Sequence, residues 1–167
     1  YSSYDGGVSV NTTLGEDYAG IEFPLGTVEH NVNNIADAKS IAMLKGFDKI
    51  WLNKNLFLTG SDENSNFTID NRSGNPLKSI VVIDDSANTE GAQILRCGVS
   101  GTLDNGVILE ECITLGINYI NGYLSRCVLA SYEIVLGGNE PAFFMECRSG
   151  IPNVLRTEPL INLGGSG

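Results

Sequence analysis

The sequence is poor in the residues that most often carry chemistry. Its 167 residues include one histidine and one tryptophan, and ten lysines and arginines against twenty aspartates and glutamates. The net charge of −10 disfavours nucleic acid as a partner, because phosphates require a surface rich in lysine and arginine. It equally disfavours docking on anionic membranes. No apolar run reaches the length of a membrane-spanning helix, so membrane insertion is not expected.

The four cysteines lack the close spacing of most zinc sites. No C-x2-C pair occurs, and the single histidine, His30, is far from every cysteine in the sequence, which leaves a cysteine nucleophile without an obvious base. Two disulfides would suit a secreted protein. We favour free, buried thiols that act as small hydrophobic groups, with disulfides as the alternative and a metal site as the least favoured interpretation. No cofactor is expected.

Catalytic motifs are missing as well. Glycosidases place two carboxyl groups across a sugar, and the chain offers the adjacent acid pairs Asp62-Glu63, Asp84-Asp85 and Glu110-Glu111. The first two pairs fall in polar turns, which is the simpler role for them. Glu110 and Glu111 should point to opposite sides of a strand, so they cannot flank one bond. No calcium-binding or phosphate-binding loop is present. We therefore predict no catalytic residue and no metal ligand.

What the sequence does contain is a repeat between Ile94 and Gly150. Each copy has a large apolar residue three positions before a cysteine and a charged residue immediately before it. The cysteines are 15, 15 and 20 residues apart, and such a period is typical of a solenoid, in which each repeat buries its apolar face on its neighbours. The cysteines are Cys97, Cys112, Cys127 and Cys147, and the charged residues are Arg96, Glu111, Arg126 and Glu146.

The alternating charges indicate how the repeats stack. Parallel strands lie about 4.8 Å apart, so equivalent positions form a vertical ladder in which alternate signs place each charge beside opposite ones. Because neighbouring strand residues point to opposite faces, the cysteines would form a second ladder in the interior. Val82 lies 15 residues before Cys97, which suggests that the period begins one turn earlier. Together with twenty glycines, this pattern predicts an all-β protein, a parallel β-helix or β-solenoid.

One amphipathic helix is predicted at about residues 34–45. Asn34 is a good N-cap, Asp37 follows as in a capping box, and Gly46 is a usual stop. Such a helix can cover the open end of a solenoid, and the alternative is packing on a side face. Its expected apolar face comprises Ile35, Ala38, Ile41, Ala42 and Leu44.

The chain is expected to divide into residues 1–48, with a strand, a loop and the capping helix, and residues 49–167, with the solenoid turns as one structural unit. It begins at Tyr1 and ends in Gly-Gly-Ser-Gly, so we expect a fragment or a processed piece. Short strands are predicted at residues 8–10, 47–52, 56–58, 67–69, 79–83, 132–136 and 160–163.

An ordered set of motifs resembles a known family. The run from Asn31 to Ala38, then Gly46-Phe47, the apolar-x-x-Cys repeats and the endings after Cys147 and Asn162 are similar to segments of bacteriophage and prophage tail-fibre or tailspike proteins. The resemblance covers roughly residues 20–167, with His30-Asn31 where proline often stands. It implies a virion component, assembled in the bacterial cytoplasm and commonly homotrimeric, which contacts other tail-fibre or baseplate domains. It supplies no catalytic motif.

The expected function is therefore that of a structural or adhesive segment that contributes to host attachment, not an enzyme. The alternatives are a carbohydrate-binding module that recognises a host surface glycan and, less favoured, a polysaccharide-cleaving tailspike fragment. Tyr119, Tyr123 and Tyr132 are the candidate ligand-binding residues, since their rings could stack on sugars or instead pack between turns or subunits. Phe143 and Phe144 are adjacent in one predicted strand, so one ring should face the interior and the other should face outward, where a subunit could cover it.

Overall fold

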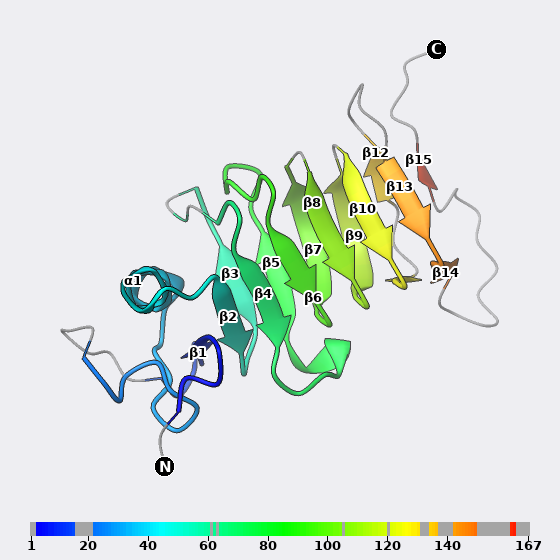
Figure 1. The fold of residues 1–167 in the computed structure, drawn as a ribbon. Helices are drawn as coiled ribbons and strands as arrows, with labels where there is room; N and C mark the ends of the chain where they lie inside the picture. Colours follow the sequence, from blue (N-terminus) through cyan, green and yellow to red (C-terminus); the bar gives the residue numbers. More distant parts are fainter. Residues whose placement is uncertain are drawn as a thin grey trace.

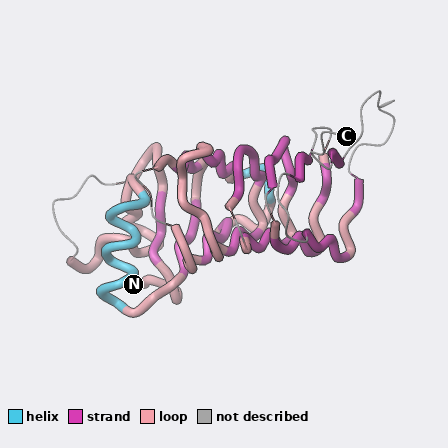
Figure 2. Tube along the Cα trace, turned by 90° about the horizontal axis from the view of Figure 1, so that it is seen from above, coloured by secondary structure: helices cyan, strands magenta, loops and turns pink. Residues whose placement is uncertain are grey.

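The computed structural model describes residues 3–15, 22–60, 62, 64–104, 106–119, 121–130, 134–136, 142–149 and 161–162. These residues form a parallel β-solenoid of about five turns with a single short α-helix at its N-terminal side, which confirms the predicted fold class. The strands stack side by side along one axis (Figure 1), and the view from above shows two layers of strands with the helix at one end (Figure 2).

Each turn of the chain supplies strands to two parallel sheets. Sheet A contains, in spatial order, β1 (Val8–Val10), β2 (Lys49–Leu52), β4 (Thr68–Asn71), β6 (Gln93–Leu95), β8 (Val107–Glu110), β10 (Gly122–Ser125) and β13 (Ala142–Met145). Sheet B contains β3 (Leu56–Leu58), β5 (Ile80–Ile83), β7 (Gly98–Leu103), β9 (Ile113–Tyr119), β11 (Val128–Leu129) and β14 (Arg148–Ser149). In addition, β12 (Ile134–Leu136) pairs with the second half of β9, and β15 (Ile161–Asn162) pairs with β12; a 3-10 helix, η1 (Pro76–Lys78), precedes β5.

The core lies between the two sheets and follows from the strand register. In sheet A, the repeated apolar residue of each turn is aligned with that of the next, and the column is almost completely buried until the last turn. Burying one such side chain contributes about 1.5–3 kcal/mol, so the column is a main source of stability. Its members are Ile50, Ile69, Ile94, Leu109, Leu124 and the partly buried Phe144.

The prediction that Val82 begins the cysteine period is wrong. Val82 pairs with Ser100, and Ile80 pairs with Gly98, so Ser79 is the residue level with Cys97. The turn between β5 and β6 is longer than the later ones because residues 84–92 contain additional hydrogen-bonded turns, including the bond from the Ala87 N–H to the Asp84 carbonyl. In this part of the stack, a residue 15 positions before a cysteine therefore does not lie level with that cysteine.

The α-helix, α1 (Ile35–Lys45), begins and ends where the sequence predicted. The Asp37 N–H donates to Oδ1 of Asn34 at 2.8 Å, and the Asn34 amide donates to Oδ2 of Asp37 at 2.7 Å. Gly46 closes the helix with φ of 75°, a conformation that glycine adopts without strain. The helix packs against β1 and β2 at the N-terminal end of the stack (Figure 1).

The predicted apolar face of α1 needs one correction. Ile35, Ala38, Ile41 and Ala42 are buried, but Leu44 is 59% exposed. Leu44 lies nine residues after Ile35, which is two and a half turns, so the two side chains leave opposite sides of the helix. The helix therefore docks through its first two turns.

We expect Asn34→Ala to lower the free energy of unfolding by about 1 kcal/mol, because it removes the N-cap acceptor. Ile41→Asp should be far more damaging, since Ile41 is 0% exposed and the substitution places a charge in the core. Chemical denaturation followed by circular dichroism measures both. Met43→Asp, at a position that is 69% exposed, is the matched control and should be nearly neutral. Equal effects of the two aspartate substitutions would contradict the docking of α1.

Candidate functional site

The four repeated charged residues occupy corners of the chain, not strand positions. Arg96, Glu111, Arg126 and Glu146 have φ of 55°, 54°, 52° and 53°, the left-handed conformation that non-glycine residues seldom adopt. Each corner joins a strand of sheet A to the cysteine that precedes the next strand of sheet B. The expectation that these residues lie within strands is therefore wrong, although they do repeat from turn to turn.

Only some of the corner residues form the ion pairs that the predicted ladder requires. Nε of Arg126 donates to Oε1 of Glu111 in the neighbouring turn at 3.3 Å, as opposite charges in a ladder would. Arg126 also forms an ion pair with Glu110, so the carboxylates of Glu110 and Glu111 reach the same guanidinium. The prediction that Glu110 and Glu111 point to opposite sides of a strand is wrong, because β8 ends at Glu110 and Glu111 has a left-handed conformation.

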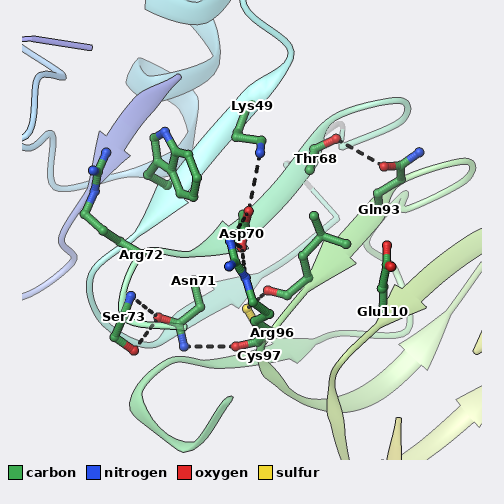
Figure 3. A network of polar contacts seen from close by, with 12 residues as sticks. Lys49, Thr68, Asp70, Asn71, Arg72, Ser73, Gln93, Arg96, Cys97 and Glu110 are labelled. Carbon is green, nitrogen blue, oxygen red and sulfur yellow. Dashed lines mark hydrogen bonds and ion pairs between the residues drawn. The ribbon is translucent and has the colours of Figure 1, made fainter. Parts of the chain in front are cut away.

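Arg96 forms its ion pair with Asp70 and not with Glu111, the neighbour in the predicted ladder. Its Nε and one terminal nitrogen lie 3.0 and 2.8 Å from Oδ1, and the same terminal nitrogen lies 2.8 Å from Oδ2 (Figure 3). Lys49 Nζ approaches Oδ2 from β2 at 3.4 Å. Asp70 is 1% exposed, and hydrogen bonds to it raise the pKa of Arg96. Because both oxygens are occupied by cations, Asp70 anchors three turns and is unsuited to act as a catalytic base.

Asn71 occupies the corner position one turn before Arg96. Its amide nitrogen donates to the carbonyl oxygens of Asn75 at 2.7 Å and Arg96 at 3.0 Å, and its Oδ1 accepts from the N–H and hydroxyl of Ser73 (Figure 3). Asn71 is completely buried. At this turn the corner position therefore holds a neutral side chain with all its hydrogen bonds made, in place of a charged one. The repeat in the sequence does not indicate this change.

The cysteines stack on the inner side of the same corners. All four thiols are free; Cys97, Cys112 and Cys127 are buried, and Cys147 is partly exposed. Thiols of the later turns donate to carbonyl oxygens of the turn before, from Cys112 to Ile94 at 3.1 Å and from Cys127 to Leu109 at 3.4 Å. Burial raises the pKa of Cys97 to about 12 and raises the pKa of Cys112 as well. Such thiols are poor nucleophiles.

The candidate aromatic residues do not share one surface. Tyr119 ends β9 in sheet B, Tyr123 lies on β10 in sheet A, and Tyr132 lies outside the described residues. Tyr123 is 45% exposed and stacks on Phe143 of β13, with ring centroids 4.8 Å apart and planes 12° apart. Phe143 is also 45% exposed, whereas Phe144 packs against the core, as strand alternation predicts.

We call Ile108, Tyr123, Phe143 and Met145 the apolar column of sheet A. Ile108, Tyr123 and Phe143 are aligned in neighbouring strands, and Met145 lies two residues beyond Phe143 with 54% exposure. Sequence reasoning missed this column as a unit. The signal was available, since Ile108, Tyr123 and Phe143 each stand four residues before a repeated cysteine.

A hollow of about 280 Å³ lies beside the buried Asp70. It is lined by Lys49, Asp70, Leu95, Arg96, Glu110 and Glu111. Ion pairs with lysine and arginine hold the three carboxylates of this lining, so the hollow offers no free pair of carboxyl groups across a sugar-sized gap.

Of the other acid pairs, Asp84-Asp85 lies in a turn and Asp62 is held by a neighbouring backbone group, whereas Glu63 lies outside the described residues. Oδ1 of Asp84 accepts from the N–H and hydroxyl of Ser86 at 2.8 and 2.6 Å, and Oδ2 of Asp62 accepts from the Thr59 N–H at 2.9 Å. In the described part of the chain, no three histidine, cysteine, aspartate or glutamate side chains gather as a metal site would require. Nor does any helix within it have the length and apolarity needed to cross a membrane.

Comparisons with protein-family models, with curated proteins and with solved structures give no match to this chain.

The corners allow a direct test of left-handed strain. Glu146 makes no ion pair with any described residue, so Glu146→Gly should raise the free energy of unfolding by about 0.5 kcal/mol by relieving the left-handed conformation. Arg96→Gly relieves the same strain but leaves the buried Asp70 without its main partner, so it should lower stability by about 2 kcal/mol. Urea denaturation of both variants checks the signs. Destabilisation by both would show that the contacts of the corner side chains outweigh the backbone strain.

Thiol titration with Ellman's reagent tests the cysteine stack. In the native protein we expect at most one thiol to react, slowly, and Cys147→Ala should abolish that reaction, because only Cys147 is partly exposed. After denaturation all four should react. The raised pKa of Cys97 means that little thiolate forms below about pH 12, so native Cys97 should stay unreactive at pH 9. Rapid native labelling of Cys97 or Cys112 would contradict the buried stack.

Proposed function

We propose that this chain is a structural and adhesive segment of a bacteriophage tail fibre or tailspike, which forms part of the virion and contributes to host attachment. The observation that carries the proposal is the continuous stack of parallel turns with an exposed apolar column along one face. A stack of this kind is a stiff rod, because each turn is hydrogen-bonded and packed on both neighbours. The sequence resemblance supplies the viral setting.

The apolar column supports self-association, and we propose a homotrimer. Tyr123 and Phe143 are each 45% exposed and Met145 is 54% exposed, so covering them would remove a contiguous apolar surface from water. The adjacent corners carry both signs of charge, with Arg126 and Glu146 in neighbouring turns, which suits a contact between identical subunits. Other tail-fibre or baseplate domains are the further proposed partners.

The aromatic geometry weighs against a sugar-binding role. Rings that bind sugars present a face to the ligand, but Tyr123 and Phe143 lie face to face with centroids 4.8 Å apart. That separation equals the spacing of neighbouring strands, so the rings stack along the solenoid and present their edges outward. A carbohydrate-binding module is therefore the second candidate, and a polysaccharide-cleaving fragment is third because the described acid pairs are bonded in turns or to arginine.

Light scattering on the isolated chain should report about three times the chain mass of 17.9 kDa. Phe143→Ser should shift the protein toward monomer while the fold is retained, because the ring lies outside the core. Phe144→Ser is the matched control and should lower thermal stability instead, since Phe144 packs against the core. A folded monomer that persists for the unaltered chain would refute the trimer. A glycan array read for binding and for turnover separates the alternatives, with no signal expected.

A further inference from the structure

The two sheets do not begin at the same turn. Sheet A starts with β1, which pairs with β2, whereas sheet B starts with β3, which follows β2 in the same turn. The described residues thus supply no strand beside β3 on the side away from β5. In Figure 1, α1 lies on that side of the stack.

A groove of about 500 Å³ occupies this position. One wall comes from Thr12, Asn34 and Ile35 at the start of the helix, and the other comes from Leu56 and Phe57 of β3. Val82 of β5 extends the lining onto the outer face of sheet B, where the Phe57 ring is 58% exposed. The groove therefore combines a strand edge with an apolar surface.

One residue of β3, Phe57, directs its backbone N–H and C=O toward the groove. The Asp84 N–H donates to the Leu58 carbonyl at 3.0 Å, so Leu58 faces β5. Because backbone groups alternate sides along a strand, the N–H and C=O of Phe57 face the opposite way, toward the groove. Within the described part of the chain, neither group has a hydrogen-bond partner. Unpaired strand-edge groups of this kind are a template for another strand.

The flanking edge positions are already satisfied, which limits the length of an added strand. The Thr12 hydroxyl donates to the Asn55 carbonyl at 2.7 Å on one side of Phe57. On the other side, the Thr59 N–H donates to Oδ2 of Asp62 at 2.9 Å. A segment in the groove could therefore form backbone hydrogen bonds with Phe57 only. On either side of Phe57 its backbone would have to turn away from β3, because the contacts at Asn55 and Thr59 occupy the edge.

We propose that this groove binds a short extended segment of another protein, which forms a β-bridge with Phe57 and places apolar side chains over Phe57 and Val82. Asp62 is the charged side chain in the lining, so a basic residue at that end of the segment is complementary. A second copy of this chain fits less well, because its net charge is −10. The mode of recognition is β-strand addition, in which main-chain bonds supply affinity and side-chain contacts supply specificity.

The test is selection from a displayed library of short random peptides against the whole chain, followed by hydrogen exchange. We expect enriched peptides to alternate apolar residues and to carry lysine or arginine at one end, and to slow exchange of the Phe57 amide. Phe57→Pro should weaken them at least about fivefold, because it removes the donor at a strand edge that tolerates proline. Phe57→Val keeps the N–H and is the matched control, with binding reduced less.

Asp62→Asn tests the charge, since asparagine retains an oxygen that can accept from Thr59. It should weaken peptides that end in lysine and leave matched peptides that end in leucine unchanged. Equal binding to the Phe57→Pro and Phe57→Val variants, or exchange protection confined to another surface, would overturn the groove as the binding site. If Phe57→Pro does not fold, the exchange map of the unaltered chain decides the matter: absence of protection at Phe57 counts against the proposal.

Discussion

The structure depends on the hydrogen bonds that join each turn to the next in register. In sheet A these bonds align Ile94, Leu109 and Leu124, so one turn's buried side chain is the packing surface of its neighbour. The left-handed corners before the cysteines keep that register, because each redirects the chain into sheet B at the same point of the turn. A shift of one residue would turn the buried column outward and the charges inward. Corner strain is the local cost of this arrangement, and the column of buried residues offsets it.

Much of the fold could be predicted from the sequence because these constraints recur at a readable spacing. The repeat revealed the stack, and Asn34, Asp37 and Gly46 revealed the ends of the helix through local capping chemistry. The corners could not be predicted, since a charged residue before a cysteine has no local preference for a left-handed backbone. For the same reason the pairing of Glu110 and Glu111 with one arginine was missed. Asp70 was missed because its partners, Lys49 and Arg96, come from other turns.

The outer face of sheet A changes character along the stack. Near the N-terminal end it is charged, and Lys49 and Arg96 both form ion pairs with Asp70. Toward the C-terminal end it is apolar, with Tyr123 and Phe143 stacked and exposed. The strand scaffold is the same in both halves, so the difference arises only from the outward positions, which the core does not constrain. A regular stack can therefore present separate surfaces to separate partners without any change in its backbone.

The N-terminal end of the stack is likewise protected against edge-to-edge association and still available for a partner. Sheet A is closed there by β1 and by the bridge between Val10 and Val32, and α1 covers the core with Ile41 and Ala42. Sheet B is blunted at Asn55 and Thr59 by side-chain contacts, which prevent a long strand from adding and so oppose uncontrolled edge-to-edge association. Between these two contacts, the N–H and C=O of Phe57 have no hydrogen-bond partner among the described residues. An edge limited to one residue favours a partner that also fits the apolar wall and the carboxylate of Asp62, because a single β-bridge alone contributes too little to hold it.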